Sequence, residues 1–321
     1  MKARFWGTRG SIPVALTSDT IRAKLVAALG AAQGKRLDTP AEIESFVEQL
    51  PFAVRGTYGG HSSCLEIERG NAPASDSHIL FDFGSGARGL GQAMLARHGQ
   101  APQTYHVFMS HLHWDHIMGF PFFTPAYIPG NRIVIHSGHP DVAEAFVRQQ
   151  EHPGFPVGFD FLGATIEFDV IEPGRRIAIA DFHVTAKKQR HGGDSYGWRL
   201  EYDDRVVVYS TDSEHRLEDL DERAAFGAFF AGADLVVFDA MYSLADAISV
   251  KADWGHSSNI VGVELCQIGG ARRLALYHHE PASDDAQIDR VLEETRRFEA
   301  LTREGDPLEI ISAYDGLAVP L

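Results

Sequence analysis

The stretch Ser110-His111-Leu112-His113-Trp114-Asp115-His116 brings three imidazoles and one carboxylate together within six consecutive positions. The run before it, Tyr105–Met109, is short, largely apolar and bounded by polar residues, which is typical of a buried β-strand. The H-x-H-x-D-H motif is therefore expected on the loop at the carboxyl end of a strand. Imidazole and carboxylate are the ligands that zinc and similar cations prefer, so this loop predicts a metal site with enough ligands for two ions. The alternative is a polar loop that is merely rich in histidine.

Three more strand-like runs lead to a potential ligand, which favours the metal site over the polar loop. Each is rich in β-branched, aromatic or other apolar residues. Phe182–Ala186 leads to His191, Arg205–Ser210 leads to Asp212, and Arg273–Tyr277 leads to His278. Loops at strand ends on a rigid scaffold are where catalytic groups concentrate. We therefore expect these side chains to converge with the H-x-H-x-D-H loop.

With these motifs the chain resembles the metallo-β-lactamase superfamily. Within it, the chain looks most like the branch that contains ribonuclease Z, phosphoribosyl cyclic-phosphate phosphodiesterases and related cyclic-nucleotide phosphodiesterases. The resemblance covers most of the chain. It begins at Phe5–Pro13, resumes at Tyr58–Cys64 and Ile79–Gly86, and continues through the metal loop to His278.

The resemblance also implies a role for each ligand. One divalent ion would be held by His111, His113 and His191, and a second by Asp115, His116 and His278, with Asp212 bridging the two. Zinc is the first expectation for both ions, with manganese or iron as alternatives. The doublet His278-His279 departs from the family pattern, and His278 is the expected ligand because it directly follows the last strand. A second departure is His61, in a glycine turn where relatives often have a smaller polar residue.

Two residues outside this ligand set, His256 and Asp82, are expected to serve catalysis together with the ligand Asp115. His256 lies in Trp254-Gly255-His256-Ser257-Ser258, just before a predicted helix. Resemblance to ribonuclease Z implies that this histidine contacts the substrate phosphate, and the alternative is a histidine that assists the helix start. Asp82 follows the strand-like run Ile79–Phe81. It is expected to orient a metal-bound histidine, and the alternative is an aspartate in a turn.

The order of the predicted elements indicates the fold class. Strand-like runs alternate with helical patterns over 141–150 and 282–301, which predicts a mixed α/β chain. The resemblance implies two packed sheets with helices outside, a four-layer αββα sandwich. Because the expected ligands extend from His111 to His278, residues 1–321 are expected to form one domain.

Residues 16–52 interrupt two glycine-rich motifs and predict a helical insertion within that domain. The segment Thr39–Glu42 has the pattern of a capping box with proline at the first helical position. The insertion is expected beside the active-site mouth or in a homodimer contact, with surface decoration as the alternative.

Composition limits the classes of partner. The chain has 321 residues, of which 44% are hydrophobic and 23% charged, and its net charge is -15. This charge disfavours broad binding of long nucleic acid, which needs a basic footprint. No window reaches the roughly eighteen apolar residues of a membrane helix, and the first residues form no apolar signal region, so the cytoplasm is the expected location. The basic run Lys187–Arg190 is interpreted as a solvated strand end, with attraction of an anionic substrate as the alternative.

Together the motifs favour a dinuclear metal-dependent phosphodiesterase in which a hydroxide bridging the two ions attacks phosphorus. The expected substrate is a small, preferably cyclic, phosphodiester, such as a cyclic nucleotide or a phosphoribosyl cyclic phosphate. The segment Gly154–Phe159 is too short for the flexible arm with which bacterial ribonuclease Z grips tRNA, which agrees with a small substrate. The alternatives are a lactone or thioester hydrolase, a tRNA 3′-end endonuclease, and a non-hydrolytic metal-binding protein on the same fold.

Overall fold

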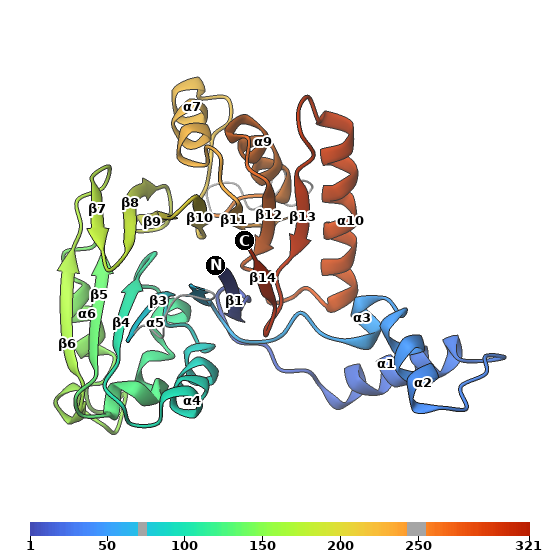
Figure 1. Ribbon diagram of the computed structural model, residues 1–321, viewed down its shortest axis with the longest axis horizontal. Coiled ribbons are helices and arrows are strands. Elements are labelled where there is room, and N and C mark those ends of the chain that lie inside the picture. Colours follow the sequence, from blue (N-terminus) through green and yellow to red (C-terminus); the bar gives the residue numbers. More distant parts are fainter. Residues whose placement is uncertain (70–75, 243–254) are drawn as a thin grey trace.

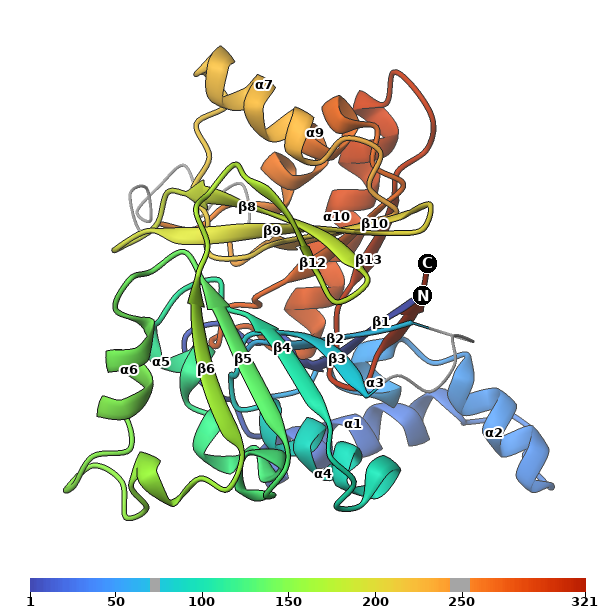
Figure 2. The ribbon, with the colours of Figure 1, turned by 60° about the vertical axis from the view of Figure 1, so that its left-hand side comes forward.

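Two seven-stranded sheets pack face to face, and helices cover their outer faces (Figures 1 and 2). The computed structural model describes residues 1–69, 76–242 and 255–321. This arrangement confirms the predicted αββα sandwich. It also explains the burial pattern, because each sheet is covered on one face by the other sheet and on the other face by helices.

The first sheet carries the strand that leads to the H-x-H-x-D-H loop. Its order is β14 (Ala318–Pro320), β1 (Lys2–Gly7), β2 (Cys64–Glu68), β3 (Ser77–Phe81), β4 (Thr104–Phe108), β5 (Arg132–Ser137) and β6 (Thr165–Val170). Strands β3 to β6 run parallel, so their carboxyl ends share one edge of the sheet. The predicted strand before the metal loop is therefore present as β4.

The second sheet carries the strands that lead to the other predicted ligands. Its order is β13 (Glu309–Ser312), β12 (Arg273–Tyr277), β11 (Leu235–Asp239), β10 (Arg205–Ser210), β9 (Ser195–Tyr202), β8 (Phe182–Gln189) and β7 (Arg176–Ile179). Strands β10 and β12 have the predicted bounds. Strand β8 extends beyond the predicted run Phe182–Ala186, because Lys187 and Lys188 pair with Gly197 and Tyr196 of β9.

Three apolar cores hold the layers together. The core between the sheets contains large side chains with no exposed surface, among them Phe5, Phe81, Trp198 and Tyr209. A second core lies under the helices of the first sheet, which include α4 (Ala87–His98), α5 (Trp114–Ile117), α6 (Val142–Arg148) and the short η1 (Phe120–Phe122), η2 (Thr124–Tyr127) and η3 (Phe159–Phe161). A third lies under α7 (Leu220–Phe229), α9 (Asn259–Gly269) and α10 (Asp285–Thr302). None of the described helices is both long enough and apolar enough to cross a membrane.

The predicted insertion folds as helices α1 (Ser18–Ala31) and α2 (Pro40–Glu48), followed by α3 (Phe52–Arg55), and extends away from the sandwich (Figure 1). The capping box is formed, since the Thr39 side chain and the Glu42 backbone are paired and the Glu42 carboxylate reaches back to the Thr39 backbone. The Lys24 side chain joins this insertion to the sandwich through an ion pair of 2.6 Å with Asp285 of α10. No residue of α1 is buried. A homodimer contact through this insertion stays a prediction.

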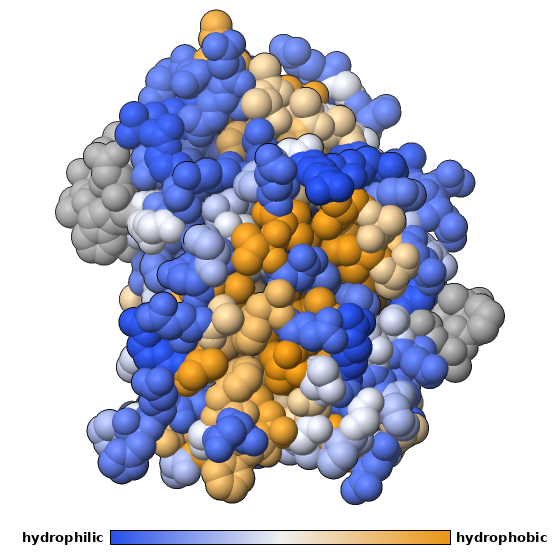
Figure 3. Space-filling view, turned by 90° about the vertical axis from the view of Figure 1, so that its left-hand side faces the viewer, coloured by the Kyte–Doolittle hydropathy of each residue, from blue (hydrophilic) through white to orange (hydrophobic). Residues whose placement is uncertain are grey.

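Strands β6 and β7 form the outer edges of the two sheets at one side of the molecule. Apolar side chains gather in the middle of that face (Figure 3). Val170, at the end of β6, has 52% of its surface exposed. Edge strands with exposed apolar residues can pair with another copy of the chain, and charged side chains nearby oppose such pairing. Here the Arg132 and Glu167 side chains are joined across β5 and β6 by an ion pair of 2.7 Å.

Candidate metal centre

The predicted ligands meet where the carboxyl ends of strands from both sheets face one another. The loop after β4 and helix α5 contribute His111, His113, Asp115 and His116, the loop after β8 contributes His191, and the residues that follow β10 and β12 are Asp212 and His278. Asp212 and His278 have positive backbone φ angles of 49° and 59°. Such angles are uncommon for residues other than glycine, and they turn the chain abruptly at the strand end.

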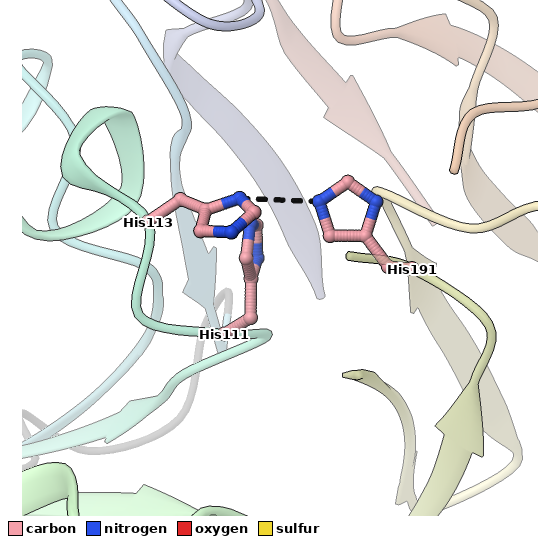
Figure 4. Close-up of side chains that lie close together, drawn as sticks. All are labelled: His111, His113 and His191. Carbon is pink, nitrogen blue, oxygen red and sulfur yellow. Dashed lines mark hydrogen bonds between the residues drawn. The ribbon is translucent and has the colours of Figure 1, made fainter. Parts of the chain in front are cut away.

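The first cluster consists of His111, His113 and His191, whose ligand atoms all lie within 4.8 Å of one another. In Figure 4 the ring of His191 approaches the two rings of the loop from the opposite sheet. The His191 Nε2 and His113 Nδ1 atoms are 3.2 Å apart. Three imidazoles that converge in this way match the donor set of a zinc-type cation.

The second cluster consists of Asp115, His116 and His278. The Oδ2 atom of Asp115 lies 3.2 Å from His116 Nε2 and 3.3 Å from His278 Nε2. All three residues are buried. A carboxylate with two imidazoles from different elements is a second arrangement that suits a divalent ion.

Asp212 lies between the two clusters. Its Oδ2 atom is 3.7 Å from His111 Nε2 and 3.8 Å from His191 Nε2, on the side of the first cluster. On the side of the second cluster, the same oxygen is 3.3 Å from His278 Nε2, and Oδ1 is 3.2 Å from His116 Nε2. The structure therefore brings all seven predicted ligands together, with Asp212 in the central position expected of a bridging carboxylate.

The second ring nitrogen of several of these histidines is already engaged. The Nδ1 atom of His116 is 2.8 Å from Asp82 Oδ2, and the Nδ1 atom of His191 is 2.7 Å from the Gly255 carbonyl. In both rings this leaves Nε2 to face the cluster, as in metal sites where an outer partner fixes the tautomer. The Nε2 atoms of His111 and His116 are buried and have no hydrogen-bond partner among the described residues. Buried polar atoms are seldom left unpaired, so the residues present fit divalent cations.

Asp82 lies behind His116 and outside the ligand clusters. Its carboxylate accepts hydrogen bonds from the Ser110 backbone, the Ser110 hydroxyl and the Tyr209 hydroxyl, at 2.7, 2.7 and 2.8 Å. With His116 Nδ1 as a fourth partner, the carboxylate is buried but well satisfied. This geometry favours the orienting role over an aspartate in a turn.

His256 lies at the edge of the centre. Its ring stacks on that of His278 with centroids 5.2 Å apart, and its Nδ1 atom is 2.8 Å from Asp239 Oδ2. Ser258 caps α9 by accepting a hydrogen bond from the Val261 backbone, so the helix start does not depend on His256. Within the quoted motif, Trp254 lies outside the described residues.

Asp239, the partner of His256, was missed at the level of the sequence. It is fully buried and also accepts hydrogen bonds from the Ser213 and Met241 backbones at 3.2 and 3.1 Å. The signal was available, because Leu235–Asp239 is an apolar run that ends in a carboxylate, as the run before Asp82 does.

Proximity of unlike charges sets the electrostatics of the centre. Burial lowers the pKa of His256, but the carboxylates of Asp239, Asp212 and Asp115 together outweigh burial and raise this pKa to about 9. Burial likewise opposes charge on Asp115 and Asp212, and the neighbouring histidines nevertheless hold the pKa of both carboxyl groups well below the usual range. For His111, burial dominates and lowers its pKa.

The remaining predicted features lie outside the centre. His279 is buried with its Nε2 atom 2.8 Å from the Ala313 carbonyl, and burial lowers its pKa to about 3. The structure thus places His278, and not His279, in the cluster. His61 is exposed and lies beside Ser85.

The basic run before His191 is occupied by structural contacts. Lys188 pairs with Asp194 at 2.7 Å, and Arg190 pairs with Glu222 at 3.1 Å. The ammonium group of Lys187 lies 4.6 Å from the centroid of the Phe226 ring. These contacts favour the solvated strand end over attraction of a substrate.

Comparison with known proteins agrees with this architecture. Residues 77–279 match the family model described as a beta-lactamase superfamily domain. The ribonuclease Z of Acaryochloris marina is 23% identical over 251 residues, which cover 63% of this chain and 76% of that protein. The ribonuclease Z of Haloarcula marismortui is 23% identical over 323 residues, which cover 83% of this chain and 96% of that protein.

Solved structures with the same fold span the whole chain. The metallo-beta-lactamase fold protein YhfI from Bacillus subtilis aligns with a TM-score of 0.64 at 17% identity, over 99% of this chain and 97% of its own. A diphosphatase from the PhnP family aligns with a TM-score of 0.58 at 16% identity, over 100% and 97%. The short form of human tRNase Z aligns with a TM-score of 0.57 at 16% identity, over 100% of both chains. Since the family model covers well over half of the sequence, the chain belongs to the metallo-β-lactamase superfamily.

Proposed function

We propose that this protein is a metal-dependent phosphodiesterase that hydrolyses a small phosphodiester. The observation that carries the proposal is the position of His256, which is held by Asp239 at the edge of a seven-ligand centre. A charged imidazole beside two cation sites is suited to a substrate whose reacting group is anionic. The relatives named ribonuclease Z and the PhnP-family diphosphatase support phosphorus chemistry.

Two divalent ions, zinc first and manganese or iron as alternatives, would be held by the two clusters and Asp212, where they would supply Lewis acidity and an activated water. The side chains themselves have defined tasks. Asp82 keeps the His116 ring oriented, and the Gly255 carbonyl does the same for His191. Asp212 holds the spacing between the clusters through its contacts with His111 and His278. Asp115 contacts His278 within the second cluster.

In the proposed reaction His256 supplies a proton to the leaving group. Its Nδ1 atom is engaged by Asp239, so the proton for the substrate is carried on Nε2. The oxygen of water forms a bond to phosphorus and releases one proton to solvent. The ester P–O bond breaks with its electron pair on the departing oxygen, which takes the proton from His256, and His256 regains a proton from solvent. In the metal-free protein the Asp239 carboxylate beside Nδ1 raises the pKa of His256, to about 9, which favours the protonated ring.

The net charge of the chain and the shortness of the segment Gly154–Phe159 both favour a small substrate. The chain carries a net charge of -15, whereas proteins that hold long nucleic acid need a basic surface. The segment Gly154–Phe159 offers no long arm. We therefore favour a small phosphodiester, preferably cyclic, over precursor tRNA, which is the alternative suggested by the names of the relatives.

The test is turnover of bis(p-nitrophenyl) phosphate and of small cyclic phosphodiesters by protein reconstituted with zinc or manganese, compared with precursor tRNA, a lactone and a thioester. His256→Ala is expected to keep both metals and to lose about ten- to a thousandfold in kcat, the scale for removing a proton donor or charge stabiliser. His61→Ala, which removes an exposed histidine outside the centre, is the matched control and should keep wild-type turnover. Turnover of tRNA alone would contradict the size of the substrate, and turnover of the lactone or thioester alone would contradict the chemistry.

A further inference from the structure

Exposed apolar side chains are concentrated on the insertion, which extends away from the sandwich (Figure 1). Of the seventeen large apolar residues that are exposed in the described part of the chain, seven lie between positions 16 and 52. Four are on α1, two are on α2 and one precedes α1: Ile21, Leu25, Val26, Leu29, Ile43, Val47 and Leu16. Soluble monomers rarely expose large groups of apolar side chains together, so this part of the surface indicates an interface.

On α1 the exposed apolar residues share one face with a positive charge. Leu25, Val26 and Leu29 have between 57% and 70% of their surface exposed. They follow Arg22 at the i+3, i+4 and i+7 positions, so Arg22 lies on the same face of the helix. Among the described residues, Arg22 has no ion-pair partner. The α1 stripe, which these four residues define, therefore combines apolar surface with one positive charge.

The exposed face of α2 carries the opposite charge. Ile43 and Val47 are one helical turn apart, and both are exposed. Glu44 is also exposed and precedes Val47 by three positions, so it lies beside them. Glu48 of the same helix pairs with Arg55 at 3.1 Å, whereas Glu44 has no ion-pair partner in the described part of the chain. The α2 stripe, formed by Ile43, Glu44 and Val47, therefore combines apolar surface with one negative charge.

The insertion is held to the sandwich by contacts at its base. Besides its ion pair with Asp285, the Lys24 ammonium group donates hydrogen bonds to the carbonyls of Ala53 and Gly56. The Ala53 backbone N–H donates to the Asp289 carboxylate of α10 at 3.1 Å. These contacts fix α1 and α3 before any partner arrives. Binding to the insertion would therefore cost little conformational entropy.

We propose that the insertion forms the interface of a homodimer in which α1 of each copy packs against α2 of the other. Charge selects this pairing. Contact between two copies of α1 would bring two Arg22 side chains together, and contact between two copies of α2 would bring two Glu44 side chains together. Packing of α1 against α2 instead places Arg22 beside Glu44 of the partner subunit, and a two-fold axis repeats that ion pair.

The charges of the insertion make a membrane surface a poorer occupant than a second copy. Helices that lie on membranes present lysine and arginine to anionic lipids. Here α2 carries Glu42, Glu44 and Glu48 and no basic residue, and the chain has a net charge of -15. An anionic lipid surface would therefore repel α2, whereas the α1 stripe of a second copy would attract it.

The mass of the full chain at micromolar concentration, measured by size-exclusion chromatography with light scattering, tests the interface. The wild type is expected near twice the single-chain mass of 35.3 kDa. Leu25→Glu combined with Leu29→Glu puts charges into the α1 stripe and should give the single-chain mass. Leu301→Glu changes an exposed leucine of α10 outside the insertion and should keep the dimer mass. Circular dichroism should match the wild type in both variants, because all three side chains are exposed. A wild type of single-chain mass, or an unchanged dimer after the two α1 substitutions, would overturn the inference.

Charge reversal tests which helices meet. Arg22→Glu alone and Glu44→Arg alone should each raise the Kd of the dimer about tenfold, since each places like charges at both copies of the contact. The double variant Arg22→Glu/Glu44→Arg restores opposite charges and should recover most of the wild-type affinity. An unchanged Kd in both single variants, or no recovery in the double variant, would contradict the packing of α1 against α2. Sedimentation of a monomeric wild type with phosphatidylserine vesicles would assign the insertion to a membrane surface and overturn the dimer.

Discussion

Replacement of Asp82 by asparagine tests whether a buried carboxylate holds one of the two clusters in place. In the wild type, Oδ1 accepts from the Ser110 backbone, and Oδ2 accepts from the Ser110 hydroxyl, Tyr209 and His116. All of these partners are donors. The amide NH₂ group of asparagine is also a donor, so it cannot pair with the partners of either oxygen. The side-chain orientation that loses the fewest hydrogen bonds keeps the amide oxygen toward the three partners of Oδ2. The Ser110 backbone N–H then faces another donor.

The size of the effect follows from that geometry. One unpaired buried donor costs about 1–3 kcal/mol, and hydrogen bonds to a charged acceptor lose part of their strength when the charge is removed. We expect Asp82→Asn to lower the free energy of unfolding of metal-free protein by about 2–4 kcal/mol. Loss of the charged partner of His116 should also weaken metal binding at the second cluster about ten- to a hundredfold.

Urea denaturation of metal-free protein measures the first effect, and zinc titration against a competing chelator measures the second. Tyr209→Phe is the matched control, because it removes one donor to Asp82 and leaves the carboxylate beside His116. It should lose about 1 kcal/mol of stability and keep wild-type zinc affinity. The reasoning is refuted if Asp82→Asn unfolds at the wild-type urea concentration and binds both ions as tightly as the wild type does.

Three further outcomes are expected. Elemental analysis should find two divalent ions per chain, and Asp212→Ala should disturb both sites, whereas His116→Ala should chiefly weaken one; a stoichiometry of one in the wild type would contradict the dinuclear centre. His278→Ala should lose metal together with activity, while His279→Ala should retain most of its metal, and the reverse pattern would exclude the assignment of His278. Burial lowers the pKa of His78 to about 4, so the unfolded state binds an additional proton between about pH 6.5 and 4, and stability should fall as the pH falls through that window. Urea titrations at pH 7 and pH 5 should show a smaller loss for His78→Gln than for the wild type, and an equal loss would argue against this origin.

The sequence predicts elements well where burial alone shapes the local pattern. Strands β10 and β12 have the predicted bounds, because each is an apolar run that begins at arginine and ends at the site. The apolar run Phe182–Ala186 covers only part of β8, because Lys187 and Lys188 are polar and their place in the strand is set by pairing with β9. Helix α10 begins at Asp285 instead of the predicted residue 282, because Asp284 forms a capping box with Gln287.

Tertiary relations were accessible only through the resemblance or not at all. Local pattern shows that His111 and His278 follow strands, but the approach of their side chains depends on how two sheets pack. The apolar run before Asp239 marks a carboxylate at a strand end, but the pairing of Asp239 with His256 of a different element has no local signature. A cavity beside Trp114 is likewise formed by helices that are separate in sequence.

The division of the ligands between the two sheets has a consequence for how long the protein survives. His111 and His113 follow a strand of one sheet and His191 follows a strand of the other. An ion bound by all three would therefore link the two sheets. A ligand that binds only the folded chain adds about 2.7 kcal/mol of stability when its free concentration is a hundred times its Kd. When metal is scarce, the two sheets would separate more often, and the chain would be more accessible to proteases. The abundance of this protein would then follow the supply of metal without any change in its synthesis.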